Sequence, residues 1–365
     1  MNILQMISKN DRYGAQRIFL DQVATLRSIS GNTVVVAGRG SEGYVTDSVQ
    51  ALGVPYHGSP MKSIKDIFFL RNIIKRYNID VIHTTLDRAD YLGVVLSKIT
   101  GIPVVSTNMV PRYHFGFRFD DKVIILAEKQ RSLLEKGGVD PGKITLVRPG
   151  IDVDRFSTPA PDKRESWKHK LNSNAYNIVL CHISSLIERK AHLISIDIAA
   201  GCKERGERPL LIIIGDPLSG EYYETLMRKI TSLGLTENVH FTGWTSEVPE
   251  ILSLSHFTVL PSENEALGVV LMEGMAAGTP IVARKGEGGA ELINDYGTGF
   301  LYNPEEGVGP LVDQIVGLRR DEEQYQALSE RCRKIAADDF SMKRFGEKLM
   351  DVYGAVLAKG EKLSR

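Results

Sequence analysis

Two glutamates close together in the chain have the residue type and spacing that best suit a chemical role. Glu265 and Glu273 are separated by seven residues and follow a short apolar run that ends at Leu260. The acidic turn and the residues after it predict a helix that begins near Leu267. The first N–H groups of a helix have no partner within it and attract anions, and Gly268 has no side chain to keep a phosphate away. This segment therefore predicts an anion site.

On a single helix, the spacing places the two carboxylates roughly 12 Å apart along the axis. That distance suits one carboxylate near a sugar and the other on a ribose, with a diphosphate between them at residues 267–269. Gly278 and Pro280 would end the helix. The alternative is that both glutamates are solvated charges on a surface helix.

A pair of adjacent cations follows another apolar run. Arg189 and Lys190 come after Ser184-Ser185, in a turn between a predicted strand and a predicted helix. The planar guanidinium and the compact ammonium would hold two charges of a leaving diphosphate and so replace a metal ion. The alternative is an ordinary pair of surface cations. A third turn, at Gly14 before the first predicted helix, would let a ligand approach the backbone and the helix dipole.

These turns belong to a chain in which short apolar runs alternate with helix-period segments, a pattern typical of parallel sheets covered by helices. In the first half we expect strands at residues 2–7, 33–37, 81–83, 104–107 and 122–126, with helices that include 15–28 and 64–77. After the Pro-rich segment 157–163 we expect strands at 177–183, 210–214, 239–242, 257–260 and 280–283, with helices at 192–205, 222–233, 248–254, 269–277 and 309–319.

We therefore predict an α/β fold with two doubly wound, Rossmann-like domains that face each other across a cleft. The domains would span residues 1–157 and 158–340, and a C-terminal helix at 341–365 would pack back on the first domain. Sheets of this kind bind ligands at the carboxyl ends of their strands, which is where the candidate turns lie.

The composition is that of a soluble globular protein, with 42% hydrophobic and 25% charged residues. Residues 1–160 contain 21 Lys and Arg against 15 Asp and Glu, whereas the rest of the chain contains 24 against 30. This modest excess, without a basic cluster interleaved with aromatics, argues against nucleic acid and for a phosphate-bearing acceptor or an anionic membrane surface. Scattered solvated charge is the alternative.

One predicted helix is suited to shallow membrane contact. It carries the cations Lys62, Lys65, Arg71, Lys75 and Arg76 together with Phe68 and Phe69. The alternative is a core-facing helix with solvated lysines. The three widely spaced cysteines, the absence of a signal-peptide pattern and the lack of an apolar run of roughly 20 residues predict a cytoplasmic protein, peripheral to the inner face of the membrane if it works there.

In their order along the chain, these motifs resemble those of the retaining GT-B glycosyltransferases of family 4, the "group 1" family. Residues 13–17 (YGAQR) are similar to the family's Gly-Gly-Ala-Glu-Arg turn, residues 146–152 (LVRPGID) to its I-P-N-G-V-D junction, and residues 238–244 (NVHFTGW) to its V-x-F-x-G strand. Glu265 and Glu273 match its E-x7-E motif, the most specific of the set. The resemblance covers nearly the whole chain.

The resemblance implies a role for each matching residue. The donor diphosphate would bind Arg189, Lys190 and the backbone of Ala266, Leu267, Gly268 and Val269. Glu273 would bind the ribose, Gly14 would border the diphosphate, and Glu265 would be catalytic, stabilising positive charge near the anomeric carbon of the donor sugar. The reaction would retain the anomeric configuration without an enzymic nucleophile, because the departing phosphate oxygen accepts the proton of the acceptor.

The sequence departs from the family pattern at several positions. Tyr13 replaces a glycine, Ser184-Ser185 replaces Gly-Arg, and Gly274 replaces the alanine after Glu273. Met109 stands where the family has a histidine, and His114 is the candidate catalytic substitute, with a loop histidine of no function as the alternative.

We expect no metal and no other cofactor. Asp152-Val153-Asp154 has the form of a metal-binding D-x-D motif but coincides with the junction motif. Residues 286–289 (GEGG) lack the spacing of a dinucleotide loop and would form a turn near the donor.

The predicted function is a metal-independent hexosyl-type transferase (EC 2.4) with a nucleotide-sugar donor, UDP-sugar favoured. Its acceptor would be a glycan or lipid-linked precursor of a cell-surface polysaccharide, lipopolysaccharide or glycolipid. The main alternative is a non-catalytic GT-B binding or partner subunit of a glycosyltransferase complex. A nucleotide-sugar epimerase and a nicotinamide oxidoreductase are disfavoured, the first by E-x7-E and the second by the missing dinucleotide fingerprint.

Overall fold

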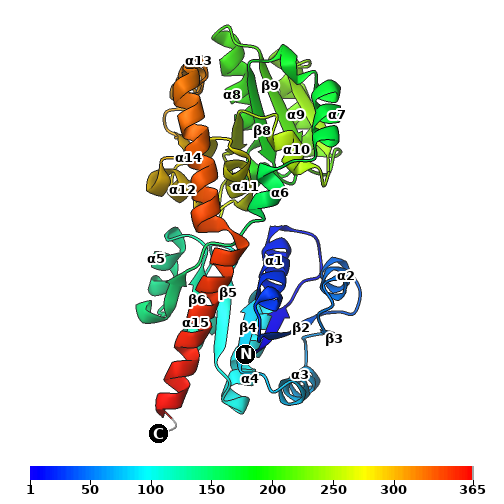
Figure 1. The fold of residues 1–365 in the computed structure, drawn as a ribbon, viewed down its shortest axis with the longest axis vertical. Helices are drawn as coiled ribbons and strands as arrows, with labels where there is room; N and C mark the ends of the chain where they lie inside the picture. Colours follow the sequence, from blue (N-terminus) through cyan, green and yellow to red (C-terminus); the bar gives the residue numbers. More distant parts are fainter. Residues whose placement is uncertain (364–365) are drawn as a thin grey trace. The chain divides into compact units, whose positions relative to one another are not determined.

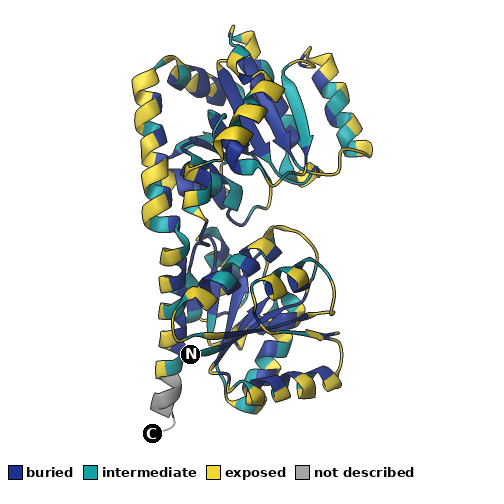
Figure 2. Cartoon of the chain, turned by 45° about the vertical axis from the view of Figure 1, so that its right-hand side comes forward, coloured by how far each residue is buried: buried dark blue, intermediate teal, exposed yellow. Residues whose placement is uncertain are grey.

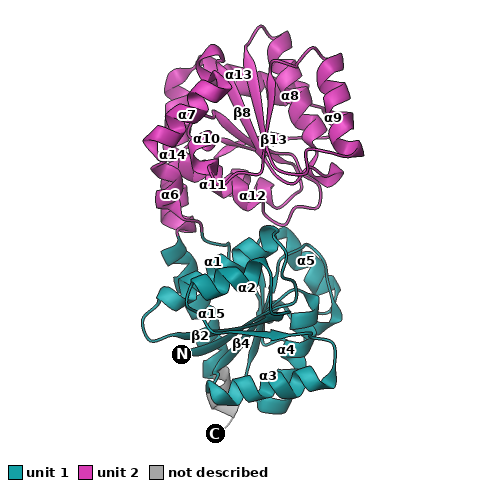
Figure 3. Ribbon diagram, turned by 90° about the vertical axis from the view of Figure 1, so that its right-hand side faces the viewer, with its two compact units in different colours: residues 1–150, 342–365 teal, residues 151–341 magenta. Residues whose placement is uncertain are grey.

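The computed structural model describes residues 1–363 and the side chains of residues 1–358. It divides the chain into two compact units (Figure 3). Unit 1 contains Met1–Gly150 and helix α15 (Met342–Leu363), and unit 2 contains Ile151–Ser341. Among the described residues, no helix is both long and apolar enough to cross a membrane.

The boundary between the units differs from the predicted one at residue 157. Ile151 and Phe156 are buried, and the backbone N–H of Ile151 donates to Phe340 O at 2.8 Å, so helix α6 (Val153–Ser157) belongs to unit 2. The Pro-rich segment that predicted a linker instead begins helix α7 (Pro161–Leu171). Proline is favourable at the first position of a helix because its missing N–H would be unpaired there in any case.

Unit 1 is built on a seven-stranded sheet whose described pairings are all parallel, in the order β3-β2-β1-β4-β5-β6-β7. Its strands are β1 (Asn2–Ile7), β2 (Thr33–Arg39), β3 (Tyr56–Ser59), β4 (Val81–Thr85), β5 (Val104–Asn108), β6 (Lys122–Ile125) and β7 (Ile144–Leu146). Its helices besides α15 are α1 (Gly14–Ser28), α2 (Tyr44–Ala51), α3 (Ile64–Arg76), α4 (Asp87–Thr100), α5 (Lys129–Lys136) and the 3-10 turns η1 (Phe115–Arg118) and η2 (Pro141–Lys143).

Helices cover both faces of this sheet because its central strands are apolar on both sides. One face packs against α1, α2 and α15, and the other against α3 and α4. Helix α15, red in Figure 1, contacts α1 and contributes Phe345, Leu349 and Tyr353 to the core. The hydroxyl of Tyr353 lies 2.5 Å from Nδ1 of His83, a residue of strand β4. Polar as well as apolar contacts therefore hold helix α15 against the sheet.

Unit 2 has a six-stranded parallel sheet in the order β10-β9-β8-β11-β12-β13. Its strands are β8 (Ile178–Ile183), β9 (Pro209–Ile214), β10 (Val239–Gly243), β11 (Phe257–Leu260), β12 (Ile281–Arg284) and β13 (Gly299–Tyr302). Its helices besides α6 and α7 are α8 (His192–Glu204), α9 (Glu221–Ser232), α10 (Val248–Leu252), α11 (Val269–Ala277), α12 (Gly289–Tyr296), α13 (Gly309–Arg320), α14 (Glu322–Phe340) and the 3-10 turns η3 (Ser173–Ala175) and η4 (Glu188–Lys190).

The strand order of each unit reverses at one point. The first strand of unit 1, β1, lies between β2 and β4, and the first strand of unit 2, β8, lies between β9 and β11. The strands of both sheets are mainly buried (Figure 2). Two doubly wound parallel sheets confirm the predicted α/β class. In such sheets, ligands bind beside the reversal point, at the carboxyl ends of the strands on either side.

Candidate functional site

The two strongest sequence motifs lie at the reversal point of unit 2. Arg189 and Lys190 form η4 after strand β8, and the Glu265 segment follows strand β11, which pairs with β8. The structure therefore brings together two segments that are about 75 residues apart.

The Lys190 ammonium and the Glu265 carboxylate form the closest contact between these segments. Lys190 Nζ lies 2.5 Å from Glu265 Oε2, and both side chains are largely buried, with exposed fractions of 16% and 18%. Arg189 Nη1 lies 3.7 Å from the same oxygen and donates to the carbonyl of Glu263 at 3.2 Å. The pair thus places a shielded cation beside a carboxylate at the edge where a ligand would bind.

Helix α11 begins at Val269, which matches the predicted range 269–277 but lies two residues after Leu267, where the acidic turn predicted the start. Ala266 and Leu267 are buried, and Gly268 adopts a left-handed conformation with φ of 81°. A Cβ on Gly268 would lie 2.7 Å from Leu260 Cδ2, so glycine is required by the backbone and by packing as well as by any ligand. The first N–H groups of α11 lie immediately after this turn and form an anion-attracting end.

The late start of α11 corrects the predicted geometry of the two glutamates. Glu265 lies in the loop before the helix, whereas Glu273 lies inside α11 and is half-buried. The separation expected for two residues on one helix therefore does not apply.

The segment 286–289 supports the Glu265 loop directly. Glu287 Oε2 accepts the backbone N–H of Glu265 at 3.0 Å, and the N–H of Gly288 donates to Glu265 O at 3.2 Å. A Cβ on Gly288 would lie 1.6 Å from Ala266 O, so only glycine fits there. The glycines of this segment predicted a turn near the donor, but their spacing does not indicate which loop the turn supports.

Two buried histidines lie next to Lys190, and sequence reasoning missed them. The rings of His182 and His192 stack with centroids 4.1 Å apart, and Ser184 Oγ lies 2.9 Å from His182 Nε2 and 3.0 Å from His192 Nε2. Burial, with the charge of Lys190 as a further cause, lowers the pKa of His192 to about 4. Burial also lowers the pKa of His182 well below its ordinary value, followed by the effects of His192 and Lys190. Both rings are therefore neutral near pH 7 and add no charge beside Lys190.

In unit 1, Gly14 begins helix α1 immediately after the exposed Tyr13. No protein atom lies within 4 Å of a Cβ built on Gly14, so packing within the protein does not require glycine here. This turn follows β1, at the reversal point of its own sheet.

The candidate histidine of unit 1 forms a buried pair with a carboxylate. His114 Nε2 lies 2.9 Å from Asp90 Oδ2, and His114 Nδ1 and Asp90 Oδ1 are buried without a hydrogen-bond partner. The ring stacks on Phe117 at a centroid distance of 3.6 Å, while Met109 is buried in the core. Asp87, Asp90 and His114 each place a possible ligand atom within 4.8 Å of the others, but Asp87 also pairs with Arg112.

Residues 163–335 match the model of the family described as "Glycosyl transferases group 1", and residues 13–155 match that of "Glycosyltransferase Family 4". Over 93% of both chains this protein is 24% identical to the Escherichia coli UDP-Gal:alpha-D-GlcNAc-diphosphoundecaprenol alpha-1,3-galactosyltransferase. A GDP-mannose-dependent phosphatidylinositol monomannoside mannosyltransferase of Mycolicibacterium smegmatis is 28% identical, over 64% of this chain and 62% of the relative.

The architecture is similar to that of solved glycosyltransferases. HepE of Anabaena, crystallised with UDP, superposes with a TM-score of 0.86 at 22% identity, covering 97% of this chain and 100% of HepE. This likeness identifies the fold as GT-B.

Proposed function

Because the chain belongs to family 4 of the GT-B glycosyltransferases, the "group 1" transferases, we propose that it is a retaining, metal-independent enzyme that uses a UDP-sugar. The Escherichia coli relative is named for UDP-Gal and HepE was crystallised with UDP, which supports this base, whereas the mycobacterial relative is named for GDP-mannose. The acceptor is a glycan or lipid-linked precursor of a cell-surface polysaccharide or glycolipid, the class to which the diphosphoundecaprenol acceptor in the name of the Escherichia coli relative belongs.

The ion pair between Lys190 and Glu265 is the observation that carries this proposal. A diphosphate bound at the start of α11 would compete with Glu265 for the Lys190 ammonium. Once Lys190 turns to the diphosphate, the Glu265 carboxylate is free to face the donor sugar. One shielded pair thus supplies a cation for the leaving group and an anion for the reacting carbon.

Charge stabilisation without a metal follows from the same groups. When the bond between the anomeric carbon and the phosphate oxygen breaks, its electron pair stays on the diphosphate. Arg189, Lys190 and the N-terminal end of α11 stabilise that negative charge, and Glu265 stabilises the positive charge on the sugar. Arg189 is the more exposed cation, with 43% of its side chain accessible, so it is free to move toward a ligand.

Retention follows if the acceptor attacks on the face that the diphosphate leaves. The acceptor oxygen forms a bond to the anomeric carbon, and its proton passes to the departing phosphate oxygen. No protein nucleophile takes part in this step. His114 and Asp90 lie in unit 1, and their buried pair has the chemistry to orient an acceptor hydroxyl.

The test is a transfer assay in EDTA with a panel of UDP-sugars and a short polyprenyl-diphosphate-linked N-acetylglucosamine acceptor. Release of UDP with an α-linked product from an α-linked donor supports the proposal, and a β-linked product refutes retention. Binding of UDP without transfer or donor hydrolysis favours the alternative of a non-catalytic partner subunit.

A further inference from the structure

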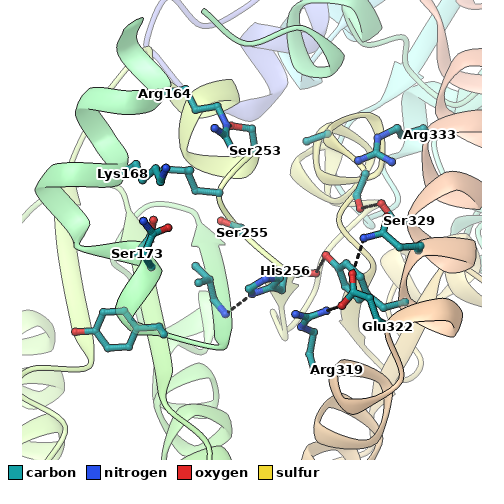
Figure 4. Close-up of a pocket in the computed structure, with 18 residues that line it drawn as sticks. Arg164, Lys168, Ser173, Ser253, Ser255, His256, Arg319, Glu322, Ser329 and Arg333 are labelled. Carbon is teal, nitrogen blue, oxygen red and sulfur yellow. Dashed lines mark hydrogen bonds and ion pairs between the residues drawn. The ribbon is translucent and has the colours of Figure 1, made fainter. Parts of the chain in front are cut away.

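A pocket lies at the opposite edge of the unit 2 sheet from the Lys190–Glu265 pair. It has a volume of about 440 Å³ and is lined by α7, the start of β8, the loop before β11, the end of α11, and α13 and α14 (Figure 4). Val179 and His256 line it at the amino ends of β8 and β11, whereas the candidate donor site lies at their carboxyl ends. The volume is in the range that holds a small metabolite, roughly 300–1,000 Å³.

The lining of this amino-end pocket is strongly basic. It includes the cations Arg164, Lys168, Arg319 and Arg333 and one acid, Glu322. Figure 4 shows Arg164 and Lys168 on one side and Arg319 and Arg333 on the other. Cations on facing walls of one cavity attract a small anion more strongly than the same charges spread over a surface.

These cations are only partly neutralised by the protein. Arg319 Nη1 lies 3.1 Å from Glu322 Oε2, and Lys168 makes a 3.5 Å contact with Glu165. Arg164 Nε donates to the hydroxyl of Ser253 at 3.2 Å and has no ion pair among the described residues. Arg333, which is exposed, likewise has no ion-pair partner within the described part of the chain. At least two guanidinium groups therefore remain available to an anion.

Other groups at the pocket donate hydrogen bonds. His256 Nδ1 accepts the backbone N–H of Val179 at 2.9 Å, which leaves the proton of the neutral ring on Nε2. Gly278 provides room for Arg333, because a Cβ at that position would lie 2.3 Å from the guanidinium carbon. Fork-shaped arginine donors beside neutral donors suit phosphate oxygens.

We propose that this amino-end pocket is a second ligand site, which binds a small phosphate-bearing metabolite and through it tunes donor binding. The link is helix α11. Its N-terminal end adjoins Gly268 and the Glu265 loop, and its C-terminal residues Ala277 and Gly278 line the amino-end pocket. Nine residues span only about 14 Å, so a small shift at one end reaches the other. This coupling rests on the proposed function, whereas anion binding in the pocket does not.

Tryptophan fluorescence reports on helix α7, which contributes Arg164 and Lys168 to the pocket. The chain has two tryptophans, and Trp167 lies on α7 between the pocket residues Arg164 and Lys168. Trp244 is 53% exposed and follows β10 at the carboxyl edge of the sheet, so Trp244→Phe leaves a single reporter at the amino edge. In this full-length variant, inorganic phosphate titrated at constant ionic strength should produce a saturable change in Trp167 emission.

The pocket cations are tested in the same background. Arg164→Gln with Arg333→Gln should raise the half-saturating phosphate concentration at least about tenfold, because each lost charged hydrogen bond weakens binding. Arg228→Gln with Lys334→Gln is the matched control, since both are exposed cations of unit 2 that do not line the pocket. Arg333→Gln alone, at an exposed and unpaired position, provides a second variant if the double variant does not fold.

The Lys190→Gln variant separates the two sites. A phosphate response of Trp167 that survives Lys190→Gln supports the amino-end pocket. No saturable response, or a response lost with Lys190→Gln but unchanged by Arg164→Gln with Arg333→Gln, overturns the proposal. A phosphate response without any change in the Kd for UDP retains the site but refutes its coupling to donor binding.

Discussion

Lys190 Nζ lies 2.5 Å from Glu265 Oε2, and this contact joins the loops that follow β8 and β11. The two residues belong to different sequence motifs, and either motif taken alone could consist of solvated surface charges. Because they pair at the reversal point of a doubly wound sheet, where ligands bind, we assign both residues to one ligand site.

Lys190→Gln tests the cation of this pair. The amide keeps much of the length but has no charge, so we expect the Kd for UDP to rise by about 10- to 100-fold, the loss typical of one charged hydrogen bond. Isothermal titration calorimetry measures the change. Lys203→Gln is the control, because Lys203 lies on α8 and donates to Gly234 O, away from the site. An unchanged Kd in Lys190→Gln would remove Lys190 from the donor site.

Gly288→Ala tests the support of the Glu265 loop. The new Cβ would lie 1.6 Å from Ala266 O, so the loop must move, at a cost of about 1–3 kcal/mol or more in the free energy of unfolding. Urea unfolding gives the stability, and the UDP titration gives the effect on the site. Gly317→Ala on α13 is the control: no atom lies within 4 Å of its Cβ, and alanine favours the helix. Equal stability of the two variants would contradict the described packing.

His192 makes the stability of unit 2 depend on pH. Its pKa is lowered to about 4, whereas the unfolded chain binds this proton near pH 6.5. Between these values the unfolded state holds more protons, so the stabilisation from the neutral ring is complete above about pH 6.5 and is lost as the pH falls toward 4. We expect His192→Gln to flatten the fall in unfolding free energy over this window. Urea unfolding at a series of pH values measures the slope, and an unchanged slope in His192→Gln would contradict this expectation.

The surface of α3 and α4 tests the membrane prediction. Ile64 is 68% exposed and Phe68 60% exposed, and Tyr91, Val95 and Ile99 form an exposed stripe on α4, which contacts α3. Phe68 therefore points outward, contrary to the alternative in which this helix turns its apolar residues toward the core. Exposed apolar groups beside Lys62 and Lys65 suit an anionic lipid surface.

We expect the protein to sediment with vesicles that contain anionic lipid at low salt. Ile64→Ser with Phe68→Ser should reduce the bound fraction several-fold. Leu233→Ser is the matched control, since Leu233 is a 40% exposed apolar residue of unit 2. The membrane prediction fails if the unmodified protein stays in the supernatant at low salt.

The sequence predicted most of the fold because its central strands are long apolar runs. Strand β9, for example, is buried along its whole length and reads as an uninterrupted hydrophobic segment. The strands that were not predicted are β3, β7 and β13, which have only three or four residues. Strand β3 contains His57 and Gly58, so it lacks the apolar pattern, and its place in the sheet depends on pairing with β2.

The candidate site could be predicted only in part. The motifs indicated that residues 189–190 and 265–269 share a ligand, but the distance between the two glutamates depended on where α11 begins. Gly268 adopts a positive φ immediately before the helix, so Glu265 lies in the preceding loop, in agreement with the predicted helix range 269–277 but not with a start near Leu267. The stacking of His182 on His192 was also not predictable, because it depends on how β8 and α8 pack.

Thermal unfolding in EDTA with a panel of nucleotides and nucleotide sugars tests whether unit 2 binds a nucleotide-sugar donor without a metal ion. A ligand at about 100 times its Kd should stabilise the protein by roughly 2.7 kcal/mol. We expect a clear rise in Tm with UDP or one UDP-sugar, unchanged when Mg²⁺ replaces EDTA and lost in Glu273→Ala. No rise with any nucleotide, or a rise that requires the metal, would contradict a metal-independent donor site at the start of α11.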